Sequence, residues 1–145
     1  MCNLQIVRQI VFECEGMSIA ETLAVTPINA TAIRLEETPL LSGDQFTFQD
    51  IIEVEEKEDG SLLCKRLIQL GGFRTEGYLL PLTLVTSEIF QEYLKWIESE
   101  GCHWEAVESR YVLISVPKDS SRNTDADIDC LLDDWDAALH PKPTK

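Results

Sequence analysis

The sequence predicts an α+β protein, with an N-terminal antiparallel β-sheet or small barrel followed by a ferredoxin-like strand-helix-strand-strand-helix half. Short apolar runs rich in β-branched residues fill the first half. Two segments with apolar residues at i, i+3, i+4 and i+7 follow in the second half. At 145 residues, we expect a single domain, with a β-rich half over 1–72, an α+β half over 73–140 and a tail over 141–145.

Five strands are predicted in the first half, and turn residues separate them. Pro27-Ile28-Asn29 is expected to turn the chain, because proline holds φ near one value and asparagine tolerates a left-handed conformation. Gly43-Asp44 is expected to turn it again, and Asp59-Gly60 between two apolar runs predicts a hairpin. The five strands are expected over 4–12, 19–26, 30–35, 50–56 and 61–70.

The second half is predicted to alternate strands with two amphipathic helices. Strands are expected over 78–85, 103–107 and 111–116. The first helix is expected to begin after the hydroxyls of Thr86 and Ser87 and to end at Gly101. The second is expected to begin at Asn123 or Thr124 and to end at Pro141. The apolar faces consist of Ile89, Phe90, Tyr93, Leu94 and Ile97 in the first helix, and of Ile128, Leu131, Leu132, Trp135 and Leu139 in the second.

The charge balance limits the partners of this protein. Acidic residues number 26 and basic residues 12, so the formal net charge is -14. A surface of this sign repels phosphate backbones and anionic membranes and attracts basic proteins, so we expect no nucleic acid and no membrane as partners. No apolar run approaches the roughly 20 residues of a membrane span. The five cysteines stand singly, which is typical of reduced thiols in a cytoplasmic protein.

Two acid-rich segments make a basic protein the expected partner. Nine acidic residues and one lysine lie between residues 36 and 60, and seven acidic residues and one arginine lie between residues 119 and 136. Concentrated carboxylates steer basic proteins to a surface, as inhibitors of nucleases do. We therefore expect a binding module rather than an enzyme, with neutralisation of a basic toxin or nuclease as its specific role. The predicted contacts are Glu53, Glu55, Glu56, Glu58 and Asp59 on the hairpin, or Asp125, Asp129, Asp133 and Asp136 on the last helix.

A regulatory module that binds a small anion or metabolite is the alternative hypothesis. Its ligand would lie near Gly71, Gly72, Arg74 and Thr75, because glycine allows backbone N–H groups to approach a bound anion closely. Lys65, Arg66 and Arg74 make this stretch the one locally basic part of the sequence.

Two segments that look like a metal-binding motif and a catalytic motif are better explained as parts of a helix and a strand without a chemical role. The acids from Asp125 to Asp136 have the spacing of a calcium-binding loop, but Cys130 stands where that loop requires glycine, and the same residues fit an amphipathic helix. Cys102 directly precedes the strand predicted over 103–107 and His103 begins it. Neighbouring residues of an extended chain point to opposite faces, so these two are not expected to form a nucleophile-base pair. We expect no catalytic residue, no metal site and no cofactor.

The sequence resembles a family of small uncharacterised bacterial proteins, known as a domain of unknown function. The resemblance rests on the run 34–41, on Gly43-Asp44 and Asp59-Gly60, on Gly71-Gly72 with Thr75, and on the pairs Gly101-Cys102 and Val116-Pro117. It extends over residues 20–135. It implies a short β half followed by a strand, a helix and a further strand in a bacterial cytoplasmic protein, and it implies no reaction.

Overall fold

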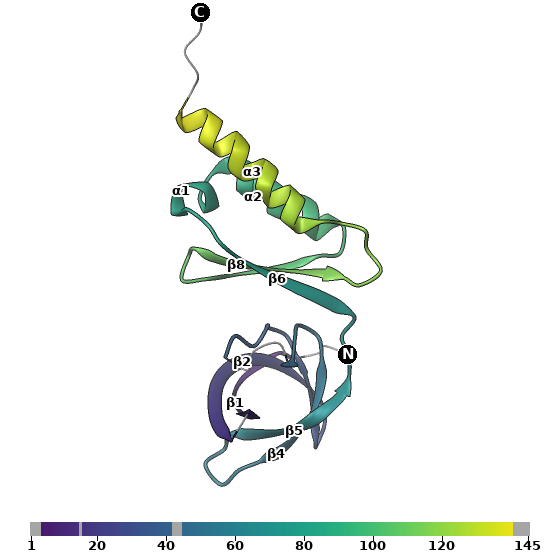
Figure 1. Ribbon diagram of the computed structural model, residues 1–145. Helices are drawn as coiled ribbons and strands as arrows, with labels where there is room; N and C mark the ends of the chain where they lie inside the picture. The colour runs from purple at the N-terminus through teal and green to yellow at the C-terminus, as the bar shows by residue number, and fades with distance from the viewer. Residues whose placement is uncertain (1–3, 15, 42–44, 141–145) are drawn as a thin grey trace, which may run out of the picture. The chain divides into compact units, whose positions relative to one another are not determined.

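The computed structural model describes residues 4–14, 16–41 and 45–140 and divides into two compact units, residues 1–74 and 75–145. Figure 1 shows strands alone in the first unit and helices together with strands in the second. The α+β class is thus confirmed. The prediction of a single domain stays a prediction. The predicted turn at Gly43-Asp44 and the predicted tail over 141–145 lie outside the described residues.

The first unit is a closed five-stranded barrel, which confirms the predicted small barrel. Its strands are β1 (Ile6–Cys14), β2 (Met17–Asn29), β3 (Ala32–Leu35), β4 (Ile51–Glu56) and β5 (Leu62–Gln69). Neighbouring strands are antiparallel except for β1 and β5, which are parallel and close the barrel where Ile10 pairs with Leu62. Alternate side chains point inward, and residues such as Phe12, Leu35 and Ile52 fill the interior.

The predicted hairpin between the second and third strands is confirmed, because β2 and β3 are antiparallel, but Pro27-Ile28-Asn29 belongs to the end of β2 rather than to the turn. The β2–β3 register shifts between Pro27 and Asn29, and such an irregularity accommodates a proline that has no N–H to donate. The chain turns just afterwards, where the Asn29 side-chain oxygen accepts a hydrogen bond from the Thr31 N–H at 2.9 Å. The asparagine therefore does shape the turn, two residues later than expected.

The second unit contains a three-stranded sheet and three helices. Its strands are β6 (Phe73–Leu79, which begins in the first unit), β7 (His103–Val107) and β8 (Tyr111–Pro117), in the spatial order β6-β8-β7. Its helices are α1 (Leu82–Val85), α2 (Glu88–Ser99) and α3 (Thr124–Leu139). All three helices pack on one face of the sheet (Figure 1), where Leu84, Phe90 and Ile128 meet Val112 and Ile114 of β8 in one core.

The predicted strand over 78–85 agrees with β6 at residues 78 and 79 alone, and β6 begins earlier, at Phe73. β6 ends at Leu79, and residues 82–85 form the short helix α1. Pro81 precedes this helix, and its carbonyl accepts hydrogen bonds from the N–H groups of Leu84 and Val85 at 3.0 and 3.1 Å. Proline has no N–H to donate to a neighbouring strand, but at the start of a helix no hydrogen bond is lost, because the N–H groups there have no partner within the helix. The apolar run therefore changes from strand to helix at Pro81.

The ferredoxin-like arrangement is not confirmed. That fold has a fourth strand after its second helix, whereas the sheet formed by the described residues has three strands. No helix among the described residues is both long and apolar enough to cross a membrane.

Candidate partner-binding face of helix α3

The start of helix α3 is held by local hydrogen bonds, as the sequence predicts. The Asn123 side-chain oxygen accepts a hydrogen bond from the Ala126 N–H at 3.1 Å, which satisfies one of the free donors of the first turn. The Tyr78 hydroxyl, on β6, lies 2.6 Å from the Thr124 hydroxyl and donates to the Asp125 carboxylate at 2.5 Å. Burial and this bond to Asp125 raise the pKa of Tyr78 well above its usual range. The first turn of α3 is therefore attached to the sheet.

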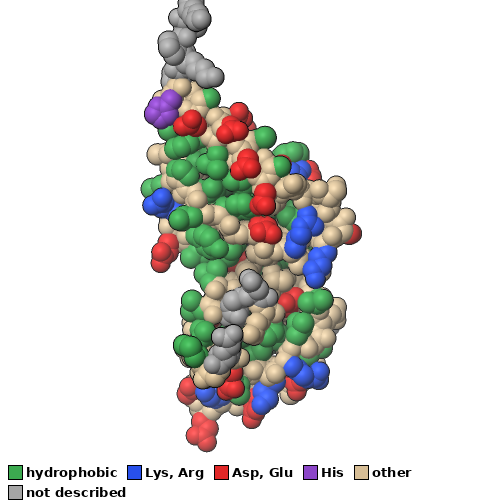
Figure 2. Space-filling model, viewed as in Figure 1, with side chains coloured by type: hydrophobic (Ala, Val, Ile, Leu, Met, Phe, Trp, Pro, Cys, Tyr) green, Lys and Arg blue, Asp and Glu red, His purple; other side chains and the backbone are tan. Residues whose placement is uncertain are grey.

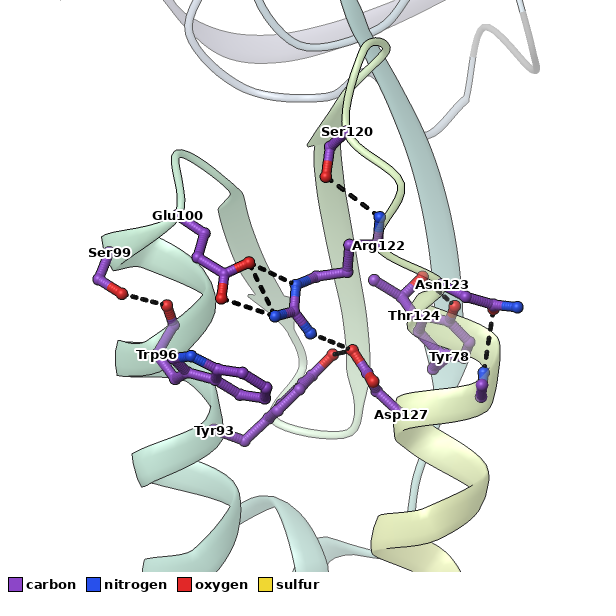
Figure 3. A network of polar contacts seen from close by, with 11 residues as sticks. Tyr78, Tyr93, Trp96, Ser99, Glu100, Ser120, Arg122, Asn123, Thr124 and Asp127 are labelled. Atoms are coloured by element: carbon purple, nitrogen blue, oxygen red, sulfur yellow. Dashed lines mark hydrogen bonds and ion pairs between the residues drawn. The ribbon is translucent and has the colours of Figure 1, made fainter.

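Arg122 attaches the same turn to α2. Its guanidinium donates to the Glu100 carboxylate at 2.7 to 3.0 Å and to the Asp127 carboxylate at 2.6 Å (Figure 3). The Arg122 side chain is 10% exposed, and its guanidinium carbon lies 4.2 Å from the centre of the Trp96 ring. The hydrogen bonds to Glu100 and then to Asp127 raise the pKa of Arg122 further above its high ordinary value. Arg122 is therefore a fixed cation within the fold.

Tyr93 completes this network from the middle of α2. Its hydroxyl donates to the Asp127 carboxylate at 2.9 Å (Figure 3), and its ring packs in the core of the second unit. Burial raises the pKa of Tyr93 well above its usual range, and the bond to Asp127 raises it further. Asp127 thus accepts hydrogen bonds from two donors, so this carboxylate has a structural role.

The apolar side of α3 faces the core along most of the helix. Ile128 is 3% exposed, and Leu131, Leu132 and Trp135 pack against the same core. Leu139 is 53% exposed, so the predicted stripe does not reach the end of the helix. In α2, Ile89 is likewise 53% exposed, although Phe90, Tyr93, Leu94 and Ile97 are buried as predicted. This packing determines which side of α3 meets solvent.

Four carboxylates form one row on the solvent side of α3. The row consists of Asp125, Asp129, Asp133 and Asp136, which are all exposed. They are separated by four, four and three residues, so they lie within one sector of the helix over a length of about 16 Å. Figure 2 shows acidic side chains following α3 in this way. The structure therefore brings together the four helical residues that the sequence predicts as a contact surface.

This row has no counter-charge among the residues that the structure describes. The lysines and arginines among the described residues of the second unit form no ion pair with any of the four aspartates. These cations are Lys95, Arg110, Lys118 and Arg122. Like charges one turn apart destabilise a helix by about 0.2–0.5 kcal/mol for each pair. Acids near the helix C-terminus also oppose the macrodipole, and no basic residue occupies the last turn. Asp125 in the first turn is favoured by the macrodipole, so it is the repulsion along the row and the later acids that weaken the helix.

The acids of the predicted hairpin surface are different, because the barrel supplies cations to three of them. Glu53 is paired with Arg66. Glu55 lies 3.4 Å from the Lys65 ammonium, and Glu56 lies 3.4 Å from the Arg8 guanidinium. Because Lys65 and Arg66 are engaged in this way, the locally basic stretch of the sequence is also compensated. The hairpin is therefore a mixed-charge surface.

The two remaining hairpin acids lie in the turn. The Asp59 carboxylate accepts hydrogen bonds from the Ser61 hydroxyl at 2.5 Å and from the Ser61 N–H at 2.9 Å. These bonds hold the pKa of Asp59 below its usual range. Gly60 has a φ of 87°, which confirms the predicted turn. Glu58 is exposed and has no ion pair within the described chain. Asp59 therefore stabilises the turn.

The residues of the alternative anion site are distributed over both units. Gly71, Gly72 and Arg74 belong to the first unit and Thr75 to the second. The Gly71 N–H already donates to the buried Asp50 carboxylate at 2.8 Å. A Cβ atom at Gly71 would lie 2.5 Å from the Gln49 carbonyl carbon, so close backbone packing requires glycine there.

Gly72 and Thr75, two further members of that site, also have local explanations. Gly72 has a φ of 83°, a conformation that favours glycine. The Thr75 hydroxyl lies 2.7 Å from the Ser115 hydroxyl within the second unit. These glycines thus have structural reasons to be present, independent of any ligand.

The helical interpretation of residues 125–136 is confirmed, because α3 is continuous from Thr124 to Leu139. A calcium loop at these residues is therefore excluded. Cys102 is buried in the core as expected, and His103 at the start of β7 is half-buried with Nε2 at 3.5 Å from the Glu105 carboxylate. Trp104 packs against the core, whereas Trp96 is 53% exposed beside Arg122.

Arg122 is the structural residue that the sequence does not single out. It is the one basic residue between 119 and 136, which is a signal that it neutralises some of the neighbouring acids. Its partner Glu100 lies 22 positions away along the chain, and Tyr93, which donates to the same Asp127 carboxylate, lies 34 positions from Asp127, so no local pattern identifies this network.

Comparison with known proteins yields a fold. No protein-family model matches the sequence, and no curated protein matches it significantly. Among solved structures, the chain is similar to a hypothetical protein from Neisseria gonorrhoeae, with a TM-score of 0.59 and 18% sequence identity. The similarity covers 96% of this chain and 92% of that protein. The result agrees with the resemblance to small uncharacterised proteins, and at this identity it shows a shared fold alone.

Proposed function

We propose that this protein is a non-enzymatic binding module of the bacterial cytoplasm that presents the aspartate row of α3 to a basic protein, and that this partner is a toxin or nuclease that it neutralises. The observation that carries the proposal is the absence of a counter-charge for this row among the described residues, in contrast to the paired acids of the hairpin. A cationic partner would supply the missing charge. The isolated cysteines support the cytoplasmic location.

The arrangement supports this role over the hairpin surface for an energetic reason. Glu53 and Glu55 would have to exchange internal ion pairs for external ones, so little net attraction would be gained. Asp129, Asp133 and Asp136 have no internal partner among the described residues, so their interaction with a cation is not offset by a broken pair. A row of this kind raises the association rate more than it slows dissociation.

The test compares two triple variants that remove the same charge. In the first, Asp129→Asn, Asp133→Asn and Asp136→Asn neutralise the row. In the second, Glu53→Gln, Glu55→Gln and Glu56→Gln neutralise the hairpin and serve as the matched control. Each protein and the wild type are immobilised, exposed to a bacterial lysate and cross-linked, and the captured proteins are identified by mass spectrometry.

The expected result is a captured protein of isoelectric point above 9 that the wild type and the hairpin variant retain and the row variant loses. Its association rate with the wild type should fall steeply with salt, because exposed charges are screened over about 10 Å at 0.1 M ionic strength. The row variant should also be more stable than the wild type, because it lacks the repulsion along α3. Equal capture by all three proteins, or capture of acidic proteins alone, would refute the proposal.

A ferredoxin-like regulatory module that binds a small anion near Gly71, Gly72, Arg74 and Thr75 is the second candidate. The order β6-β8-β7 supports it, because one strand lies between two others that a helix connects, as in the split βαβ unit. A thermal-shift screen with phosphate, sulfate and carboxylate anions tests it. A ligand at 100 times its dissociation constant adds about 2.7 kcal/mol of stability, so a panel without any shift would reject this candidate.

A further inference from the structure

Strand β6 is an edge of the sheet in the second unit, and it lies next to a groove. Within the described residues β6 pairs with β8 alone. An open groove of about 450 Å³ lies between β6 and α3, and residues of both elements line it. On the β6 side the lining includes Gly77 and Leu79.

The direction of β6 shows which of its backbone groups face outward. The Leu80 N–H donates to the Arg110 carbonyl at 2.9 Å, and the Thr75 hydroxyl contacts that of Ser115. These two pairs run in opposite order along the chain, so β6 and β8 are antiparallel. In such a pair, alternate residues direct both N–H and C=O to the same side. Because Leu80 faces β8, the backbone groups of Leu79 and Gly77 face the open edge.

The α3 side of the groove combines apolar and acidic residues. Ile128 and Leu132 supply apolar surface, and Asp125 and Asp129 supply two members of the aspartate row. The two aspartates are one helical turn apart, about 6 Å along the axis. Alternate side chains on one face of a strand are about 6.6 Å apart. The spacing of the aspartates thus matches basic residues at positions i and i+2 of an extended chain.

We propose that the basic partner binds by adding an extended segment to the outer edge of β6, with Lys or Arg at alternate positions facing Asp125 and Asp129. This inference rests on the proposed function and specifies its mode of recognition. The segment would occupy the place of a fourth strand, and backbone bonds to Gly77 and Leu79 would provide affinity while the aspartates provide specificity. The segment is added antiparallel to β6, so residues opposite Gly77 and Leu79 donate these bonds. The residue between those two and the residue that flanks them turn their side chains toward α3.

The test uses the full chain and a capped synthetic peptide of sequence TKVKVT. The control peptide has the same sequence with N-methyl groups on both valines, so it keeps the charge and side chains but lacks the two N–H donors that would face β6. NMR titration of the isotope-labelled protein measures the affinity and the positions of binding. We expect the unmodified peptide to bind at least tenfold more tightly and to slow hydrogen exchange of the Gly77 and Leu79 amides.

Two protein variants separate this mode from the general role of the aspartate row. Leu79→Pro removes an outward N–H without removing a bond to β8, and it should weaken the unmodified peptide about tenfold while circular dichroism remains unchanged. Asp125→Asn with Asp129→Asn should weaken both peptides and reduce the salt dependence. Equal binding of both peptides, sensitive to the aspartates but not to Leu79→Pro, would overturn edge pairing and leave the proposed function intact. Binding insensitive to the aspartates would overturn both.

The edge also has to be free before the peptide arrives. Amides of Gly77 and Leu79 that are protected without peptide, increasingly so at higher protein concentration, would show that a second copy of this chain occupies the edge. Protection independent of concentration would show that the chain itself covers it. Either result would overturn the proposal.

Discussion

Replacement of Arg122 by alanine tests whether the position of α3 depends on the network in Figure 3. The guanidinium joins Glu100, at the end of α2, to Asp127, in the first turns of α3, and it covers the Trp96 ring. Alanine removes all three contacts and leaves the half-buried Asp127 carboxylate with the Tyr93 hydroxyl as its remaining donor among these side chains.

The expected destabilisation follows from the exposure of each contact. The Asp127 side chain is 25% exposed, so its charge-assisted bond contributes about 1.5–3 kcal/mol. The Glu100 side chain is 41% exposed, and solvent screening limits its contribution to less than about 1 kcal/mol. The contact with the Trp96 ring adds about 0.5–1 kcal/mol. We therefore expect Arg122→Ala to lower the free energy of unfolding of the second unit by about 3 kcal/mol.

Urea denaturation followed by tryptophan fluorescence measures this change, because all three tryptophans lie in residues 75–145. Lys118→Ala is the matched control, since Lys118 is an exposed cation in the preceding segment and forms no ion pair within the described chain. A double-mutant cycle with Asp127→Asn should show a coupling energy of at least about 1 kcal/mol. A loss below about 1 kcal/mol, or one equal to that of Lys118→Ala, would refute this account of the network.

Three further predictions concern the barrel and the cysteines. Gly71→Ala should destabilise the barrel by about 1–3 kcal/mol in far-ultraviolet circular dichroism melts, because the new Cβ meets backbone; an unchanged melt would contradict this. Burial raises the pKa of Cys64 to about 11, so its thiol should react slowly with iodoacetamide at pH 8. Peptide mapping should find the exposed Cys130 alkylated and Cys64 unmodified until urea is added. Equal alkylation of the two cysteines in the native protein would contradict this. Hydrogen bonds from Ser61 lower the pKa of Asp59, so the ionised carboxylate stabilises the fold above the pKa of an unfolded aspartate, and this stabilisation is lost as the pH falls through the lowered pKa. Asp59→Asn should remove this acid-dependent loss of stability. A variant whose stability has the same pH profile as the wild type would contradict the prediction.

Several elements were predictable because the signals that form them are local. The Ser87 hydroxyl accepts from the Phe90 N–H at 3.2 Å, and Gly101, with a φ of 89°, follows the end of α2. Asn123 begins α3 in the same way. A cap and a positive φ involve residues within four positions of one another, so a sequence pattern identifies them. The apolar run that includes Pro81 does not reveal its structure, because short buried strands and short buried helices have the same apolar pattern.

The candidate site was only half predictable. The spacing of Asp125, Asp129, Asp133 and Asp136 is a property of the helix itself, so the sequence alone placed them in one row. The ion pairs of Glu53 and Glu55 depend on the register between β4 and β5, and the pair of Glu56 with Arg8 joins residues 48 positions apart. Nothing in the local sequence distinguishes a paired acid from an unpaired one.

The α+β class, the acidic character, the capped helix ends and the alignment of the aspartates follow from the amino-acid sequence, because composition and short-range periodicity encode these properties. Three other properties depend on how the chain folds: cations of the barrel compensate three hairpin acids, Arg122 binds Glu100 and Asp127, and β6 is an edge strand beside α3 within the described residues. The physical reason is that the field at a carboxylate depends on charges a few ångströms away in space, and folding brings those charges from distant parts of the chain.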